Sequence, residues 1–358
     1  MVGRKIYIDH IKGFALLVIC LSHLLQATSS PHTISKVIDV LMYLTVPLFF
    51  FISGMLYQAE KYESFNMYFK HKTKTLLIPY LALSLLFAVL CPYLFQPDYL
   101  VHQLGYPRHD FLTSFLPIRV SAIIEWFIGD LVCIVIGISS RSTMPLWFVF
   151  ILYFVSISFY WIYSHLNRWT ICIAVMASLL AFFLPRNMVL SYLHIPAFFM
   201  AFFFYALGFF CRHIQNSSSI IKVCGFGAAL LIYILVDFRG TNGFVNGLFG
   251  ESLIRFILHV CSGIYIIIYL FKQLERLQFA WLKLIMTPFQ YISRNALPIL
   301  AIHFWAMLVF VVFFSKMMTP DYLFYTDFIF VSLVVVLLVP TINKYIHWIQ
   351  NISFISAN

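Results

Sequence analysis

Long apolar runs recur along the whole chain and are separated by short polar stretches. A helix that crosses the hydrocarbon core of a bilayer needs about 20 mostly apolar residues, and runs of that length are the main feature of this chain. The pattern therefore predicts about ten transmembrane helices, with both termini in the cytoplasm. They are expected at residues 11–28, 37–57, 76–95, 145–163, 169–185, 190–211, 221–237, 252–271, 292–314 and 323–342.

A further apolar stretch at 122–139 is at the short limit for crossing and carries Glu125 and Asp130. The positive-inside rule favours a stretch that does not cross. With a cytoplasmic N-terminus, fifteen of the 23 basic residues then lie inside, whereas an eleventh span would leave about twelve there. We therefore expect 122–139 to form an interfacial or re-entrant element on the outer side.

Composition agrees with this all-α polytopic membrane fold. The chain is 62% hydrophobic and 10% charged, which is outside the range of soluble domains. The net charge of +10 suits cytoplasmic loops that face anionic lipid headgroups, so membrane lipids are the expected partners and nucleic acid is not. The seven cysteines form no C-x-x-C pair, which gives no sign of a metal site. We expect one integral-membrane domain over 1–358, with no appended soluble domain.

The first apolar run carries ionisable residues at both ends. Lys12 and His23 are eleven residues apart, which is three helical turns plus about 20°, so both side chains leave one face of the helix. The rise separates them by roughly 16 Å. A lone membrane histidine is more often a packing residue, and a lysine at a helix end is usually a snorkelling anchor. Their shared face instead favours a functional pair, in which His23 could be a general base.

Three lysines precede the third span, and cationic side chains there would suit phosphate groups. The plainer interpretation is a cluster that only sets topology. The basic residues are Lys70, Lys72 and Lys74.

Three polar residues on other spans could serve chemistry or packing. Ser53 follows a proline-containing segment of the second span, and Asn295 and His303 lie on the ninth. Each of them, taken alone, is more often a packing residue. Each could also donate a hydrogen bond to a negatively charged oxygen.

Taken in order, these segments resemble the membrane-bound acyltransferase 3 family, and most closely its fucose 4-O-acetylase-like branch. Asp9, Lys12 and His23 fit the family's motif of a basic residue, ten residues and a histidine. The other landmarks follow in register over nearly the whole chain. The matching segments are 9–23, 46–54, 76–80, 146–148 and 295–303.

The resemblance implies transfer of an acyl group, usually acetyl from acetyl-CoA, to a carbohydrate hydroxyl, with no metal. His23 would be the catalytic residue, Asp9 a supporting residue, and Lys12 would lie on the donor side with the three lysines. The acceptor would be a cell-surface polysaccharide or its lipid-linked precursor, at a bacterial inner membrane. One departure is that Lys72 and Thr75 stand where the family often has two arginines, and lysine lacks the bidentate fork of arginine.

Two questions stay open at the level of sequence. Glu125 and Asp130 could orient the base or bind sugar hydroxyls, or they could belong to a hydrated helix at the membrane surface. A transporter or flippase for a glycan or small solute is the rival class. It is disfavoured because the chain shows no inverted repeat or paired broken helices.

Overall fold

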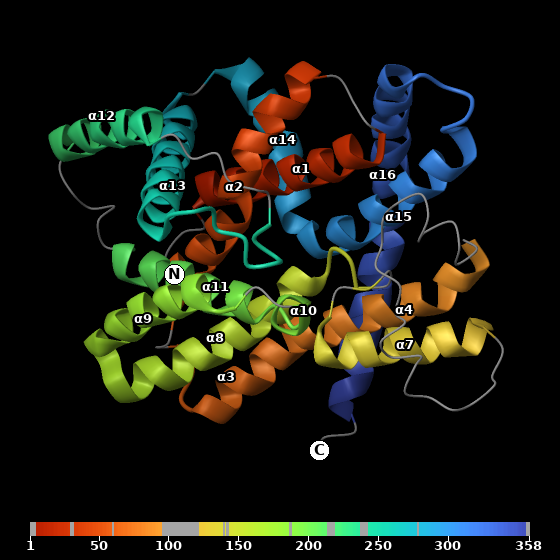
Figure 1. The fold of residues 1–358 in the computed structure, drawn as a ribbon, viewed down its shortest axis with the longest axis horizontal. Coiled ribbons are helices and arrows are strands. Elements are labelled where there is room, and N and C mark those ends of the chain that lie inside the picture. The colour runs from red at the N-terminus through yellow and green to blue at the C-terminus, as the bar shows by residue number, and fades with distance from the viewer. Residues whose placement is uncertain are drawn as a thin grey trace.

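Helices account for nearly all of the chain that the computed structural model describes, which is residues 5–28, 32–58, 61–94, 122–138, 140, 143–185, 188–212, 219–236, 243–277 and 279–355. Within these ranges the only β pairing is an isolated antiparallel bridge between Gly243 and Leu248. The all-α fold class is confirmed (Figure 1).

The first two helices pack as a hairpin, and the next two form one long, interrupted helix. Helix α1 spans Ile6–Thr28 and α2 spans His32–Met55, so a three-residue connection makes them antiparallel. Helices α3 (Phe65–Lys72) and α4 (Ile78–Leu94) are joined by a π-helical turn at Thr73–Leu77. Such turns are often found at functional sites.

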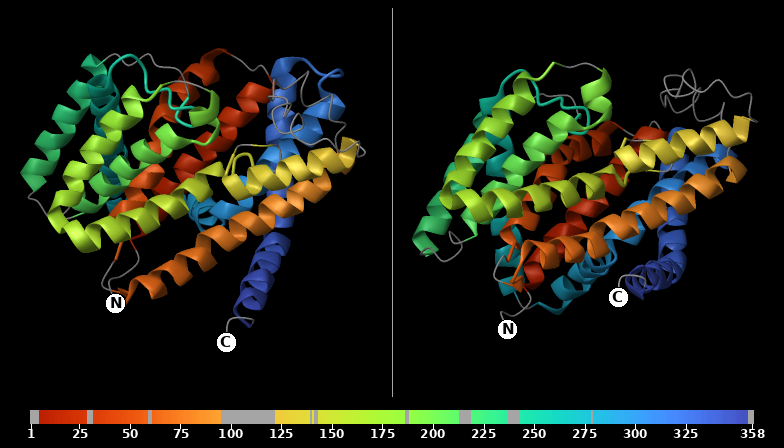
Figure 2. Two further views of the ribbon diagram at one scale, coloured as in Figure 1. Left: turned by 60° about the horizontal axis from the view of Figure 1, so that its bottom comes forward. Right: turned by 90° about the horizontal axis from the view of Figure 1, so that it is seen from below.

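Helices α7 (Ala122–Ile136) and α8 (Trp147–Leu166) run one after the other beside α3 and α4 (Figure 2). The pairing is antiparallel: Tyr68 stacks on Tyr160 at 4.5 Å between ring centroids, whereas the Tyr80 hydroxyl donates to the carbonyl of Ile134 at 3.0 Å. Residues 122–136 of the stretch expected on the outer side form helix α7, which packs against α4. Its place as an interfacial or re-entrant element remains a prediction. Residues 95–121, which precede it, lie outside the described residues.

The middle of the chain forms five further helices and a short 3₁₀ turn. Asn167 has a left-handed backbone (φ 45°), and the chain reverses there between α8 and α9. The apolar runs at 145–163 and 169–185 thus form two separate helices, and their crossing of the membrane as two spans remains a prediction. The elements are the turn Asn167–Trp169, α9 (Thr170–Phe183), α10 (Met188–Tyr192), α11 (Ile195–Cys211), α12 (Ser219–Leu235) and α13 (Leu253–Arg276).

The last part of the chain departs from the expected spans. Helix α14 (Ala280–Arg294) ends just before Asn295, and α15 (Ala296–Phe314) begins just after it. The expected span 292–314 therefore starts a few residues too early. Asn295 sits at the junction, where its amide donates to the Tyr291 carbonyl at 2.9 Å. Helix α16 (Pro320–Ile355) is longer than the predicted span at 323–342.

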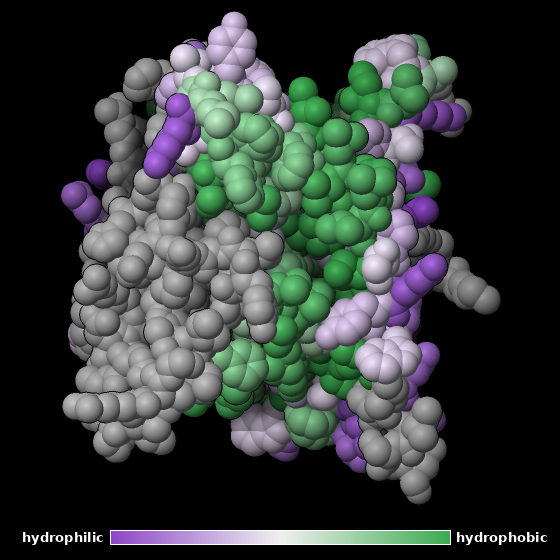
Figure 3. Space-filling model, turned by 90° about the vertical axis from the view of Figure 1, so that its right-hand side faces the viewer, coloured by the Kyte–Doolittle hydropathy of each residue, from purple (hydrophilic) through white to green (hydrophobic). Residues whose placement is uncertain are grey.

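Seven helical segments of the described residues are long and apolar enough to cross a membrane, and three more are apolar but shorter. One of the seven, Trp147–Phe183, contains both α8 and α9. On the side of the molecule that carries α16, the coloured residues in Figure 3 are largely hydrophobic. Exposed leucines and valines of α16, such as Leu333, Val336 and Leu337, suit contact with lipid tails. These features confirm a polytopic membrane protein.

Glycines allow close helix contacts in the bundle. A Cβ atom on Gly54 of α2 would collide with the backbone carbonyl of Tyr205 in α11, and one on Gly208 would collide with that of Phe51. Gly13 of α1 meets the carbonyl of Phe289 in α14 in the same way. Small residues at such crossings let membrane helices approach closely.

The ends of several helices lie on one side of the bundle, close to Lys74 and Lys272. We call this side the basic side. There the Lys272 ammonium of α13 lies 5.2 Å from the centre of the Tyr7 ring in α1. On the same side, the amide of Gln350 in α16 donates to the carbonyl of Lys74 at 2.8 Å. Helix α1 therefore begins, and α16 ends, on one side of the molecule (Figure 2).

Candidate active site

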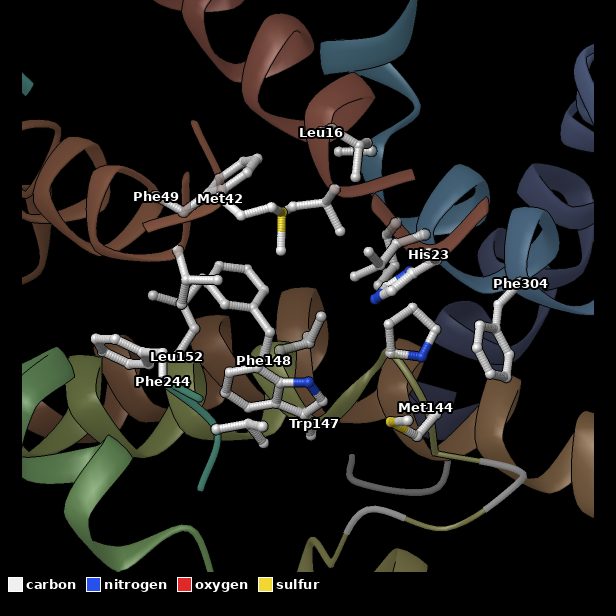
Figure 4. A pocket seen from close by; sticks show the side chains of 18 of the residues that line it. Leu16, His23, Met42, Phe49, Met144, Trp147, Phe148, Leu152, Phe244 and Phe304 are labelled. Atoms are coloured by element: carbon white, nitrogen blue, oxygen red, sulfur yellow. The ribbon is translucent and has the colours of Figure 1, made fainter. Parts of the chain in front are cut away.

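A cavity of about 660 Å³ lies between α1, α2, α8, α15 and the turn at 243–248 (Figure 4). One face of α1 runs along it, because the lining residues of α1 recur every three or four positions. These residues are Lys12, Leu16, Ile19, His23, Gln26 and Ala27.

The cavity is long enough to join two depths of the membrane. Lys12 and Ala27 are fifteen residues apart, which corresponds to about 22 Å along α1. Lys12 marks the end nearest the basic side, together with Thr75 and Ser293. The predicted placement of Lys12 and His23 on one face is confirmed, and that face looks into a single cavity.

The middle of the cavity is lined by bulky apolar side chains. Met42 and Phe49 of α2 and Phe148 and Leu152 of α8 surround it, and Phe244 approaches from the turn (Figure 4). Such walls leave few partners for water, so polar groups that reach the cavity act in a medium of low polarity. A charge or a hydrogen bond there has a stronger effect than at the protein surface.

His23 meets a second histidine at the side of the cavity. Its Nδ1 lies 3.0 Å from Nε2 of His303 in α15. The two ring planes differ by only 7°, while the ring centroids are 5.3 Å apart. Since the nitrogens are much closer than the ring centres, the rings meet edge to edge in nearly one plane. This is the geometry of an in-plane hydrogen bond between imidazoles.

Two further contacts hold this pair in place. Nδ1 of His303 lies 2.9 Å from the carbonyl oxygen of Ile299, one turn earlier in α15. The Phe304 ring packs against the His23 ring at 5.8 Å in a T-shaped arrangement. His303 is buried, whereas His23 is half-buried and lines the cavity.

Comparison with known proteins gives one match. Residues 5–343 match the model of a family described as an acyltransferase domain. The chain belongs to this acyltransferase family. No curated protein and no solved structure matches the chain.

The lysines of the acyltransferase that were predicted to bind the donor do not all reach the cavity. Of the four predicted for the donor, only Lys12 lines the cavity. The Lys72 ammonium lies 5.4 Å from the centre of the Tyr68 ring, which directs it along α3. Lys70 is exposed and Lys74 is half-buried. Thr75, one of the positions where the chain departs from the family pattern, does reach the cavity.

The polar residues that were predicted to lie near the reacting groups also differ in whether they line the cavity. Ser53 lines the cavity, but it lies near the end of α2, which is antiparallel to α1, so it belongs to the Lys12 end. Asn295 is not among the lining residues, and its side-chain oxygen accepts a hydrogen bond from Asn343 at 2.8 Å. His303 stands behind His23 rather than in the cavity.

Two of the predicted acidic residues, Asp9 and Asp130, are not among the described residues that line the cavity. Asp130 is fully buried in α7. Glu125 is on the same helix, where the structure describes only the backbone. Asp9 lies on the first turn of α1, and the Ser293 hydroxyl is 3.5 Å from its carboxylate. Within the described part of the chain, no group of three or more metal-ligating side chains is found.

Several lining residues were not predicted from the sequence. Gln26 follows His23 by three residues on the same face of α1, and periodicity alone could have indicated it. Trp147 lies within the matching segment 146–148, but its place in the cavity was not predicted. Tyr43 and Asn246 carried no such signal, because a helix and a turn distant in sequence from His23 bring them to the cavity.

The turn at 243–250 closes the cavity away from the basic side. Asn246 is exposed and contributes to the lining. The turn is held by His194, whose Nδ1 donates to the Val245 carbonyl at 3.1 Å and whose ring packs on Trp147 at 5.4 Å.

Proposed function

We propose that this acyltransferase moves an acetyl group from cytoplasmic acetyl-CoA to a carbohydrate hydroxyl at a bacterial inner membrane. The likeness to fucose 4-O-acetylase-like proteins points to a sugar acceptor, in a cell-surface polysaccharide or its lipid-linked precursor. One observation carries the proposal: a single cavity holds a cation, Lys12, at one end and an imidazole, His23, about 16 Å further along α1.

Donor binding is assigned to the basic side. Phosphate groups of the donor would meet Lys12, with Lys70, Lys72 and Lys74 raising the positive potential around the entrance. The slender pantetheine arm could then extend past Thr75 and Ser293. An arm spanning about half of the roughly 30 Å hydrocarbon core would bring the thioester to the depth of His23.

Chemistry is assigned to His23. Its imidazole would remove the proton of the acceptor hydroxyl as the oxygen attacks the thioester carbon. Gln26 lies on the same face one turn further on, so its carboxamide could donate to the oxyanion that develops. Ser53 is too near the Lys12 end for that task, and it is better suited to the donor arm.

The acceptor is assigned to the end of the cavity lined by Gln26, Trp147 and Asn246. Amide groups can both donate to and accept from sugar hydroxyls. An indole ring combines an apolar face with one N–H donor.

A radiolabel assay tests this function. Proteoliposomes with the purified protein would receive labelled acetyl-CoA and candidate glycans, and His23→Gln would be compared with wild type. We expect transfer to fall roughly 10²- to 10⁴-fold, which is the usual contribution of a general base. His165, exposed on α8 and away from the cavity, provides the control His165→Gln, which should retain activity.

Two results would contradict the proposal. Unchanged transfer in His23→Gln would exclude His23 as the base. Flux of a glycan or small solute across the vesicles, without label transfer to any glycan, would favour a transporter or flippase.

A further inference from the structure

We propose that His303 is a positioning residue that fixes the tautomer of His23 and shares its proton during acyl transfer. This inference rests on the proposed function, because it assumes that His23 is the base. It also gives His303 a different role from the oxyanion donor expected from its place in the sequence.

The protonation of His303 follows from its partners. The Ile299 carbonyl can only accept a hydrogen bond, so the His303 Nδ1 at 2.9 Å must carry a hydrogen. A neutral imidazole has one N–H group, which leaves the Nε2 of His303 with a lone pair. His303 is 2% exposed, and a buried imidazole without a counterion favours this neutral form.

The protonation of His23 follows in turn. Its Nδ1 lies 3.0 Å from the lone pair of His303 Nε2, so the Nδ1 of His23 must be the donor. The single N–H of neutral His23 is then used, and its Nε2 has a free lone pair. His23 lines the cavity, and its imidazole points into it in Figure 4. The pair therefore presents a base nitrogen where an acceptor hydroxyl would arrive.

The proton balance of the reaction uses this arrangement. The acceptor O–H proton moves to Nε2 of His23 while the acceptor oxygen bonds to the acyl carbon. When the C–S bond breaks, the electron pair stays on sulfur, and Nε2 returns the proton to give the free thiol. Between these steps His23 is an imidazolium, and its Nδ1–H donates a charge-assisted hydrogen bond to His303.

The same contacts argue against His303 as an oxyanion donor. Its Nδ1 donates to Ile299 and its Nε2 accepts from His23, so neither nitrogen of the neutral ring has a hydrogen to offer the cavity. His303 is also absent from the cavity lining.

Two substitutions separate this role from packing. His303→Leu keeps a side chain of similar bulk but removes the acceptor, so nothing holds the hydrogen on Nδ1 of His23 and the neutral ring can carry it on Nε2 instead. We expect kcat to fall roughly 10²- to 10⁴-fold, with the KM values of acetyl-CoA and acceptor retained. His303→Gln can place a carboxamide oxygen near the former Nε2, and we expect it to recover much of the lost kcat.

A spectroscopic measurement reports the tautomer directly. In ¹⁵N-histidine-labelled wild-type protein, solid-state NMR should show His23 with a protonated Nδ1 and an unprotonated Nε2. His303→Leu should reverse this pattern, while His303→Gln should preserve it. A His23 signal that is protonated on Nε2 in the wild-type protein would overturn the inference. So would full kcat in His303→Leu.

The variants also distinguish a failure of this inference from a failure of the proposed function. If His23→Gln abolishes transfer but His303→Leu does not, His23 remains the base and only the role of His303 is wrong. If neither substitution alters transfer, the function assigned to the cavity is wrong as well. A His303→Leu protein that unfolds in detergent leaves His303→Gln and the wild-type spectrum to decide, since both retain the acceptor.

Discussion

Lys12 and His23 stand about three turns apart on α1, and each gives its part of the cavity a different chemistry. Lys12 supplies a positive charge near the basic side. His23 supplies a nitrogen that can hold a proton, within apolar walls that strengthen polar interactions. Asn246 adds an amide from a turn that is remote in sequence. This division predicts that substitutions at the two ends should affect different substrates.

At the donor end, Lys12→Ala should raise the KM of acetyl-CoA about 10- to 100-fold, because hydrogen bonds to charged groups contribute about 1.5–3 kcal/mol. Steady-state kinetics with varied acetyl-CoA checks this, and Lys12→Arg, which keeps the charge, should lose less. An equal rise in the KM of the acceptor would contradict a donor role for Lys12.

At the opposite end, Asn246→Ala should raise the KM of the sugar acceptor about 2- to 10-fold, as expected for the loss of a neutral hydrogen bond. The KM of acetyl-CoA should stay unchanged. The matched variant is Lys12→Ala, for which the KM of acetyl-CoA should rise instead. Kinetics with varied acceptor would test the assignment. It fails if the acceptor KM is that of the wild type.

At the scale of elements, glycines and a π-helical turn decide how the cavity walls are placed. The contact of Gly54 with the Tyr205 carbonyl brings α2 against α11. The turn at Thr73–Leu77 interrupts the helix, and Thr75 within it reaches the cavity. Helices without these features would pack further apart or present other residues.

The glycine contacts can be tested by stability. Gly54→Ala should lower the free energy of unfolding by about 1–3 kcal/mol, since the added methyl group overfills a packed crossing. Thermal unfolding in detergent would measure this. The matched control is Gly227→Ala in α12, where nothing lies within 4 Å of the new Cβ. The control should be neutral or stabilising by up to about 1 kcal/mol. Equal melting temperatures for the two variants would contradict the packing argument.

At the scale of the whole molecule, the helices present an apolar surface outward and one polar-ended cavity inward. The start of α1 and the end of α16 lie on the basic side. Positive charge on that side agrees with a cytoplasmic location for both termini, which remains a prediction.

The orientation can be tested with epitope tags at the two ends of the chain. In intact spheroplasts both tags should resist added protease, and in inverted vesicles both should be cleaved, because both ends are expected to face the cytoplasm. A tag within residues 96–121, between the expected span 76–95 and the stretch expected on the outer side, is the reciprocal control. Cleavage of only one terminal tag in spheroplasts would exclude the proposed topology.

The sequence alone determined the properties that depend on neighbours along the chain. Apolar run length defined the membrane helices, and the 3.6-residue period placed Lys12 and His23 on one face. It began the ninth span at residue 292, whereas α14 continues to Arg294 and α15 begins at Ala296, because a helix end is set by contacts that run length does not report.

Only the tertiary structure decided which residues meet. His23 and His303 are 280 positions apart, and no local pattern reports their 3.0 Å contact or the tautomer that it sets. Asn246 reaches the cavity from a turn, and Asn295 is turned to Asn343. Such contacts arise from the packing of whole helices, which depends on many distant side chains at once.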